Sequence, residues 1–227
     1  TVIQAALQVA YRLGYLPEYT ADQVKRPKAA EKQIECFTVE EQKKIEAAAL
    51  ADRRPKMFGI VLCLYTGLRI GELLALEWSD IDFAKGEISV NKSCHDSNKD
   101  GRYCRLIEAP KTPTSRRIVP IPKQLLPLLR EQKKKSSAAF VVGEDKVQTV
   151  RSYQYSFSLL LRRIGIPHRG FHALRHTFAT RALECGMDVK TLSEILGHKN
   201  PTVTLNRYVH SLMPHKHEMM NRLGKLL

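Results

Sequence analysis

The feature that most constrains the fold is a change of hydrophobic pattern over residues 86–121. ISV at 88–90 and RRIVPIP at 116–122 alternate in the way that half-buried strands do. Between them, NKDG at 98–101 is typical of a tight hairpin turn. These signals predict a small antiparallel sheet of about three strands.

Helical patterns occupy most of the remaining chain. Thr38 and Glu41 have the spacing of a capping box, and Gly67 and Gly197 suit helix ends. The expected helices cover residues 2–13, 38–51, 55–66, a short stretch after 67, 122–135, 147–164, 172–185, 188–196, 201–211 and 215–226. The predicted fold class is therefore mainly α with a small three-stranded antiparallel β-sheet.

The N-terminal part is expected to be separate from the rest. VIQAALQVAYRL at 2–13 predicts a helix that ends at Gly14, and the basic, proline-containing stretch KRPKAAEKQ follows at 25–33. We place a domain boundary near residue 30, which gives domains at 1–30 and 31–227. Because the chain starts in mid-pattern without a methionine, we expect it to be part of a longer protein.

The charge of the chain indicates a polyanionic partner. Lys and Arg number 37 against 23 Asp and Glu, a formal net charge of +14. The longest apolar runs, such as IVLCLYTGL at 60–68, are much shorter than the roughly 20 residues of a membrane span. Nucleic acid is therefore favoured over a membrane.

The cysteines favour reduced thiols of a cytosolic protein. Their number is odd and their spacing is not that of a metal site. They are Cys36, Cys63, Cys94, Cys104 and Cys185. Cys94-His95 with Cys104 could form a metal clip, but a cross-strand pair on a hairpin explains the spacing equally well.

Four segments place cations and histidines at turns and helix starts. In TGLRIGELLAL, Arg69 follows the break at Gly67, and Glu72 lies three positions on, where it could hold the arginine. The alternative is an ordinary surface ion pair. In APKTPTSRRIVPIP, Lys111 lies at the turn between two strands, either solvated or able to deliver a proton to a substrate.

The other two segments lie in the second half of the chain. HRGFHALRHTFATRALECG places His172 and Arg175 on one helix face, whereas His176 fits a buried packing role. LGHKNPTVTLNRYVH contains His198 and Tyr208. Taken alone, Tyr208 belongs to an apolar helical stripe and would simply pack.

Together these residues suit phosphate chemistry that runs on cations alone. The sequence has no carboxylate cluster or Walker loop for a divalent metal, so we expect neither a metal nor a cofactor. Attack by a phenol on a phosphodiester produces a phosphotyrosine diester with little net change in energy. Arginines and a histidine would stabilise the charge, and another cation would protonate the departing alkoxide.

The order of the motifs resembles the catalytic domain of the tyrosine recombinases, the phage-integrase family. TGLRxxEL, KTxxSRRxVP, HxLRHTFAT and LGHxxxxxTxxxY follow each other as in that family, over roughly residues 35–210. Gly71 stands where many relatives carry serine. The long hairpin SCHDSNKDGRYC at 93–104 is most similar to integrases of conjugative transposons. The resemblance implies the DNA breaking–rejoining fold.

The resemblance also implies a role for each matching residue. Arg69, Arg175 and His198 would bind and stabilise the scissile phosphate. Lys111 would be the general acid for the 5′-hydroxyl, with His172 assisting proton transfer. Tyr208 would form a 3′-phosphotyrosine, and Glu72 would support the site. Residues 1–30 would be the end of a helical core-binding domain.

The implied function is a site-specific recombinase for excision and integration of a mobile element. Its partners would be double-stranded DNA at the element ends and target site, and further copies of itself, from dimer to tetramer. The tail with Met219, Leu223 and Leu226 at helical spacing would dock on a neighbouring subunit. The expected location is the bacterial cytoplasm, on the nucleoid.

DNA contacts are expected mainly at phosphates. Arg151 and Gln154, on the helix from 147, and Lys199 are candidate DNA-binding residues. Three other functions compete with recombination by an integrase. A DNA-binding regulator with an idle site is disfavoured because every catalytic position holds the competent residue. A type IB topoisomerase would share the chemistry, and a chromosome-dimer resolvase would share the family.

Overall fold

The computed structural model describes residues 2–19, 36–52, 54–99, 102–109, 116–143, 148–198, 200, 220–221 and 224. The chain divides into two compact units, residues 1–33 and 34–227. Across the described ranges, no helix combines the length and the hydropathy that a membrane crossing requires.

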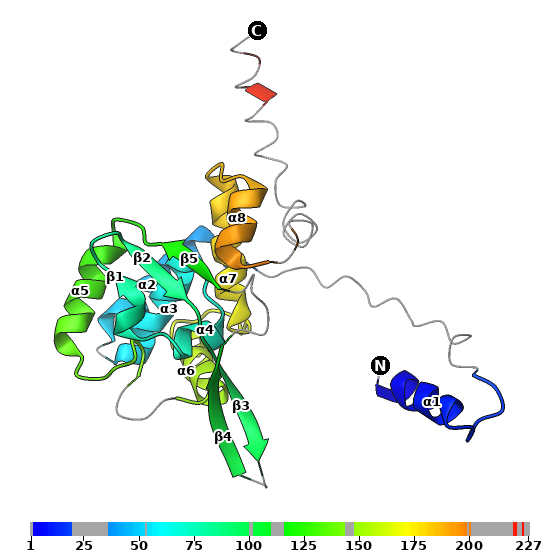
Figure 1. Ribbon diagram of the computed structural model, residues 1–227. Helices are drawn as coiled ribbons and strands as arrows, with labels where there is room; N and C mark the ends of the chain where they lie inside the picture. Colours follow the sequence, from blue (N-terminus) through cyan, green and yellow to red (C-terminus); the bar gives the residue numbers. More distant parts are fainter. Residues whose placement is uncertain are drawn as a thin grey trace. The chain divides into compact units, whose positions relative to one another are not determined.

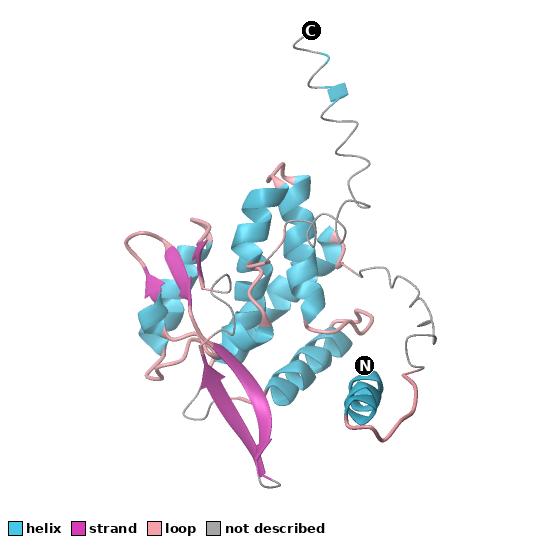
Figure 2. Cartoon of the chain, turned by 45° about the vertical axis from the view of Figure 1, so that its right-hand side comes forward, coloured by secondary structure: helices cyan, strands magenta, loops and turns pink. Residues whose placement is uncertain are grey.

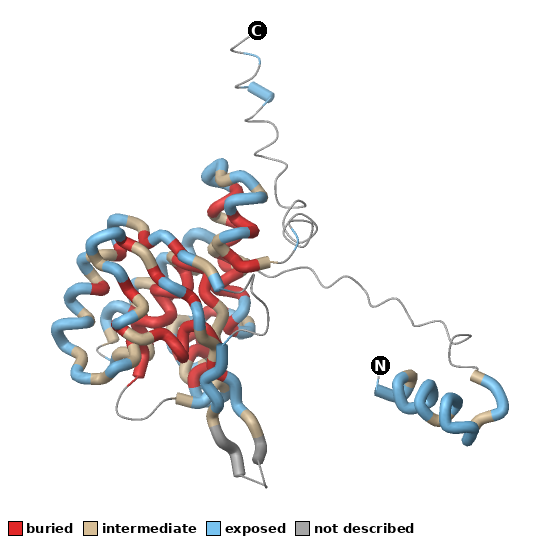
Figure 3. Tube along the Cα trace, in the orientation of Figure 1, coloured by how far each residue is buried: buried red, intermediate tan, exposed pale blue. Residues whose placement is uncertain are grey.

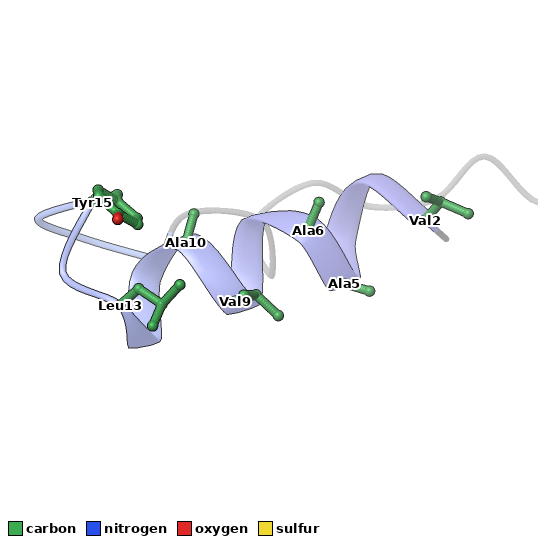
Figure 4. Close-up of a pocket in the computed structure, with 7 residues that line it drawn as sticks. All are labelled: Val2, Ala5, Ala6, Val9, Ala10, Leu13 and Tyr15. Carbon is green, nitrogen blue, oxygen red and sulfur yellow. The ribbon is translucent and has the colours of Figure 1, made fainter.

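The described residues of the first unit, 2–19, contain one helix, α1 (Val2–Arg12), which is followed by Gly14 in the left-handed region at φ 75°. The expected helix at 2–13 is therefore confirmed. One side of α1 and the turn after it carries apolar groups (Figure 4). They are Val2, Ala5, Ala6, Val9, Ala10, Leu13 and Tyr15. No residue of α1 is buried, so this apolar side faces solvent within the unit.

The second unit is built around α3 (Pro55–Thr66), whose residues from Met57 to Leu64 are all buried. A helix that is apolar all round belongs in a core. It packs against α2 (Val39–Ala51), α5 (Leu125–Lys135), α6 (Val150–Arg163) and α7 (His172–Glu184) (Figures 1 and 3).

Local signals set the helix ends. Thr38 and Glu41 form both hydrogen bonds of the expected capping box at the start of α2. Asp188 caps α8 (Val189–Leu196). Gly67 and Gly197 end α3 and α8 with φ of 65° and 66°, a conformation that costs glycine little. The expected helices in these regions are confirmed.

In the part of the chain that the structure describes, the strands form two sheets rather than one. The three-stranded antiparallel sheet has the order β1 (Ile81–Asp82), β2 (Glu87–Val90), β5 (Arg117–Pro120), and Ile88 pairs with Val119. A short 3-10 helix, η1 (Trp78–Asp80), precedes β1. The fold class is as predicted, but the third strand comes from Ile81–Asp82, just before the segment that showed alternation.

The NKDG hairpin forms a sheet of its own. Strands β3 (Ser93–Lys99) and β4 (Arg102–Glu108) pair with each other and extend away from the helices (Figures 1 and 2). Their register places Cys94 opposite Ile107 and Cys104 opposite Ser97. The register therefore does not pair the two cysteines with each other, so the cross-strand pair that the sequence left open does not form.

The base of the hairpin lies against α4 (Ile70–Leu74). A Cβ at Gly71 would lie 2.5 Å from the carbonyl oxygen of Cys94 and 2.7 Å from Oγ of Ser93. Glycine at position 71 therefore allows strand β3 to approach this helix closely. Among the described residues, no group of three or more His, Cys, Asp or Glu side chains could hold a metal ion.

Candidate active site

Arg175 is the most deeply buried of the candidate residues. It lies on α7 with only 2% of its surface exposed. Its Nη1 donates to the carbonyl of Gly67 at 2.7 Å, and its Nη2 donates to the carbonyl of Leu196 at 2.6 Å. Arg175 therefore joins the end of α3 to the end of α8.

His198 shares the same guanidinium. Its Nε2 lies 3.0 Å from Nη2 of Arg175. Because a guanidinium has no acceptor atom, Nη2 must donate and Nε2 must accept. In this arrangement the imidazole therefore carries no proton on Nε2. The backbone N–H of His198 donates to Ser193, which fixes the residue to the last turn of α8.

Arg69 is the N-cap residue of α4 and keeps part of its side chain open to solvent. Its Nη1 donates to Oε1 of Glu72 at 2.8 Å, and its Nη2 donates to the carbonyl of Gly197 at 3.2 Å. The side chain is 36% exposed. Arg69 is therefore oriented by the protein but remains accessible to a ligand.

Glu72 is a buried carboxylate that accepts from four donors. Oε1 accepts from Nη1 of Arg69 and from Nη1 of Arg117 at 2.9 Å. Oε2 accepts from the backbone N–H of Arg69 and from Nη2 of Arg117 at 2.8 Å. The surface ion pair considered from sequence is not what the structure contains, because the Glu72 side chain is only 6% exposed.

These contacts keep Glu72 ionised. Burial by itself raises the pKa of the carboxyl, but the hydrogen bonds and positive charge of Arg117, followed by those of Arg69, lower it to about 2. The carboxylate is therefore charged at neutral pH and holds both arginines.

The C-terminal end of α8 gathers three arginines. The consecutive carbonyls of Ile195, Leu196 and Gly197 each accept a hydrogen bond from a different guanidinium. The donors are Arg117, Arg175 and Arg69. Carbonyls at a helix C-terminus carry partial negative charge and lack helical partners, so they suit cations.

The two histidines of α7 lie at its first turn and just beyond it. His172 is exposed and begins the helix, on the same element as Arg175. Its ring meets that of His176 edge-on, with the centroids 4.4 Å apart. The sequence suggested a buried His176, but the structure places it half-buried.

The structure thus brings together Arg69, Glu72, Arg175 and His198, with His172 on the same helix as Arg175. The tail residues Met219, Leu223 and Leu226 lie outside the described residues, and so do three candidate site residues. They are Lys111, Lys199 and Tyr208.

The candidate DNA-contacting pair on α6 is exposed. Arg151 and Gln154 lie one turn apart, and both are open to solvent. Another side of the helix carries Tyr153 and Phe157 into the core. This placement is compatible with contact to a large external ligand.

Arg117 lies in the motif KTxxSRRxVP, but the sequence indicated no role for it in the site. The sequence held a signal, because residues 117, 119 and 121 fall on one side of the alternating stretch 116–122, and the structure buries Val119 and Ile121. The alternation is hard to recognise because the apolar Ile118, which is 57% exposed, stands at a position where a polar residue would be expected. Arg117 therefore faces inward, with its side chain 6% exposed.

The arrangement is suited to binding an anion. Three arginines and one glutamate leave a net charge of about +2, and each guanidinium is fixed by backbone carbonyls. Guanidinium groups fork onto the non-bridging oxygens of a phosphate. Donors fixed in advance stabilise charge that develops on such oxygens during reaction.

Comparisons with known proteins agree with this chemistry. The model of the phage integrase family matches residues 31–215. A tyrosine recombinase XerC-like protein of Caldanaerobacter subterraneus subsp. tengcongensis is 37% identical over 86% of this chain. The ICEBs1 integrase of Bacillus subtilis is 33% identical over 100% of it. The chain spans 55% and 64% of the lengths of these two relatives.

Among solved structures, the chain resembles the integrase of transposon Tn1549 in complex with a circular intermediate DNA. The TM-score is 0.77 at 25% sequence identity, and the match covers 97% of this chain and 76% of the other. The catalytic fold expected from the motifs is therefore confirmed.

Proposed function

We propose that this chain, which belongs to the phage integrase family, is the catalytic part of a site-specific DNA recombinase. It cleaves and rejoins DNA strands through a 3′-phosphotyrosine intermediate and serves the excision and integration of a mobile element. The observation that carries this proposal is the buried Arg175, which joins the ends of α3 and α8 and contacts His198 beside Arg69.

Each residue has a role in the cleavage step. Arg69, Arg175 and His198 bind the scissile phosphate and stabilise the charge on its oxygens. The phenolic oxygen of Tyr208 forms a bond to phosphorus, and its proton passes toward His172. The bond from phosphorus to the 5′-oxygen breaks, and that oxygen takes a proton from Lys111.

Cleavage replaces the phosphodiester of the DNA by a phosphotyrosine diester, so rejoining is the same step in reverse. The 5′-hydroxyl of a second strand attacks the phosphotyrosine and releases the Tyr208 phenol. The placement of Lys111 and Tyr208 rests on the family motifs.

The proposed partners are double-stranded DNA at element ends and target sites, and further copies of the protein, from dimer to tetramer. The likeness to an integrase whose structure contains a circular intermediate DNA supports the DNA partner. The tail carrying Met219, Leu223 and Leu226 docks on a neighbouring subunit and couples cleavage to assembly. The location is the bacterial cytoplasm, on the nucleoid.

Residues 1–30 belong, in this proposal, to a helical core-binding domain that closes around the DNA with the catalytic domain at 31–227. The exposed apolar side of α1 supports this assignment, because such a side is normally covered in a packed domain (Figure 4).

A covalent-adduct assay tests the proposal. The intact protein is incubated with nicked suicide substrates that carry the element's own ends, and DNA-linked protein is detected on denaturing gels. The wild type and Tyr155→Phe, a change at an exposed tyrosine of α6, are expected to form the adduct. Tyr208→Phe is expected to form none. An adduct with Tyr208→Phe, or none with the wild type, contradicts the mechanism.

A second assay separates this function from its alternatives. A recombinase exchanges strands between two duplexes, whereas a type IB topoisomerase only relaxes supercoils. An integrase of a mobile element acts on the element's ends, whereas a chromosome-dimer resolvase acts on a chromosomal site. A regulator with an idle site binds without cleaving. Strand exchange at the element's ends is the expected result.

A further inference from the structure

Arg117 is a buried arginine that the proposed cleavage step leaves without a role. Its Nη1 and Nη2 bind the two oxygens of Glu72 at 2.9 and 2.8 Å, and its Nε donates to the carbonyl of Ile195 at 2.5 Å. The residue thus spans from the α4 carboxylate to the last turn of α8.

The first consequence of this arrangement is electrostatic. With Arg69 as its only partner, the Glu72 carboxylate would cancel the charge of Arg69 in a one-to-one ion pair. With Arg117 present, two guanidinium groups share one carboxylate, and the three residues together carry about one positive charge. The more exposed member, Arg69 at 36% of its side chain, is the one that can present this charge to a ligand.

The second consequence is geometric. Ile195 directly precedes Leu196 and Gly197, whose carbonyls orient Arg175 and Arg69. His198 follows in the same segment. A shift at Ile195 would therefore move the acceptors of both arginines as well as the imidazole. The Cβ that Gly197 lacks would lie 3.1 Å from Cδ of Arg117, so the two residues also fit closely.

We infer that Arg117 is a positioning residue for strand cleavage, which holds Glu72 and the end of α8 so that Arg69 keeps its orientation and its positive charge for the scissile phosphate. This inference rests on the proposed function, because it assigns Arg117 to the same phosphate site. Arg117 itself need not touch the DNA.

Single-turnover adduct formation at saturating DNA tests the inference on the intact protein. The variants are Arg117→Gln, Arg117→Lys and the double variant Glu72→Gln/Arg117→Gln. Arg130→Gln, at an exposed arginine of α5, is the matched control for loss of one positive charge from a basic protein. Each protein is measured on a normal scissile phosphate and on an uncharged methylphosphonate at the same position.

Arg117→Gln is expected to slow adduct formation at least about tenfold on the phosphate, with DNA affinity close to that of Arg130→Gln. Arg117→Lys should be intermediate, because it keeps the charge but loses the planar fork. The double variant should be faster than Arg117→Gln, since it removes the unbalanced carboxylate. On the methylphosphonate the deficit of Arg117→Gln should shrink, because a neutral linkage needs less charge from Arg69.

Two results overturn the inference. One is a wild-type rate for Arg117→Gln. The other is an equal slowing on both linkages, which would show that Arg117 only supports folding. If Arg117→Gln does not fold, as judged by circular dichroism, Arg117→Lys decides. Its slowing on the phosphate is then compared with its slowing on the methylphosphonate. Absence of an adduct with the wild-type protein refutes the proposed function instead, so the two failures are distinguishable.

Discussion

Glu72 ties the stability of the molecule to pH. Its pKa lies at about 2 instead of the ordinary 4.5, although burial raises it, because Arg117 and Arg69 favour the charged form. The lowered pKa contributes stability that is complete at pH values above the ordinary pKa of 4.5 and is lost as the pH falls toward 2. From about pH 5 to pH 3 the loss due to Glu72 is roughly 2 kcal/mol.

Urea unfolding at these two pH values measures the effect. Glu72→Gln should lower the free energy of unfolding at neutral pH and should remove this pH-dependent part of it. Glu40→Gln, at an exposed carboxylate of α2, should keep the wild-type response to pH. The same response in Glu72→Gln as in the wild type would contradict the assignment.

Arg175 cannot be replaced by another cation. A lysine keeps the charge but lacks the planar fork that reaches Gly67, Leu196 and His198 together. Arg175→Lys should reduce the rate of covalent-adduct formation by about 100-fold or more. Arg181→Lys, on the same helix and half-buried, should stay near the wild-type rate. Equal rates for the two variants would exclude a role of the Arg175 fork.

At the scale of single residues, the sequence predicted the cations better than it predicted what holds them. Arg69, Arg175 and His198 stand in motifs with helix-breaking glycines, and the structure brings them together. Their acceptors are backbone carbonyls of Gly67, Leu196 and Gly197, which no side-chain pattern marks. Tertiary contacts bring these carbonyls to the arginines, because α7 with Arg175 packs against both α3 and α8, and Arg69 reaches Gly197 from the N-cap of α4.

At the scale of elements, the fit of α4 against strand β3 depends on Gly71. A Cβ there would lie 2.5 Å from the backbone oxygen of Cys94. Because this oxygen belongs to the backbone, the movement of a side chain could not relieve the clash. Gly71→Ser should therefore lower the free energy of unfolding by roughly 1–3 kcal/mol, the usual cost of overpacking. Thermal unfolding by calorimetry measures it.

Gly170→Ala is the matched control for this element contact, because a Cβ at Gly170 meets nothing within 4 Å. It should leave the unfolding temperature nearly unchanged. If Gly71→Ser unfolds at the same temperature as Gly170→Ala, strand β3 does not approach α4 as closely as described. The serine that many relatives carry at this position would then be compatible with this hairpin too.

The helices were predictable because capping residues and glycines act on neighbouring residues. Strand pairing depends on partners far away in the sequence, which these local signals do not identify. The capping box of Thr38 and Glu41 and the glycines at 67 and 197 act within a few residues. Strand β2, in contrast, pairs with Ile81–Asp82 and with a strand that lies beyond the whole hairpin. A two-residue strand such as β1 has too short an alternation to be recognised from sequence.

At the scale of the whole molecule, the net charge of +14 predicts that the proposed binding to DNA is sensitive to salt. Each phosphate that a lysine or arginine neutralises releases a counterion, so affinity falls steeply as salt rises. A protein with about six to ten such contacts loses roughly 10³–10⁵-fold in affinity from about 50 to 200 mM salt. Fluorescence anisotropy over that range should show a loss of this order, and a flat response would exclude binding dominated by phosphate contacts.

The exposed side of α6 should add sequence preference to this general attraction. Arg151 and Gln154 lie together there, and an arginine reading a guanine edge is worth roughly 1–3 kcal/mol of discrimination. Arg151→Gln should therefore lower affinity for the element's ends much more than for random DNA, with little change in salt slope. Arg162→Gln, exposed at the other end of α6, should keep the preference. If Arg151→Gln weakens both DNAs equally and lowers the salt slope by about one, Arg151 contacts a phosphate and base reading must lie elsewhere.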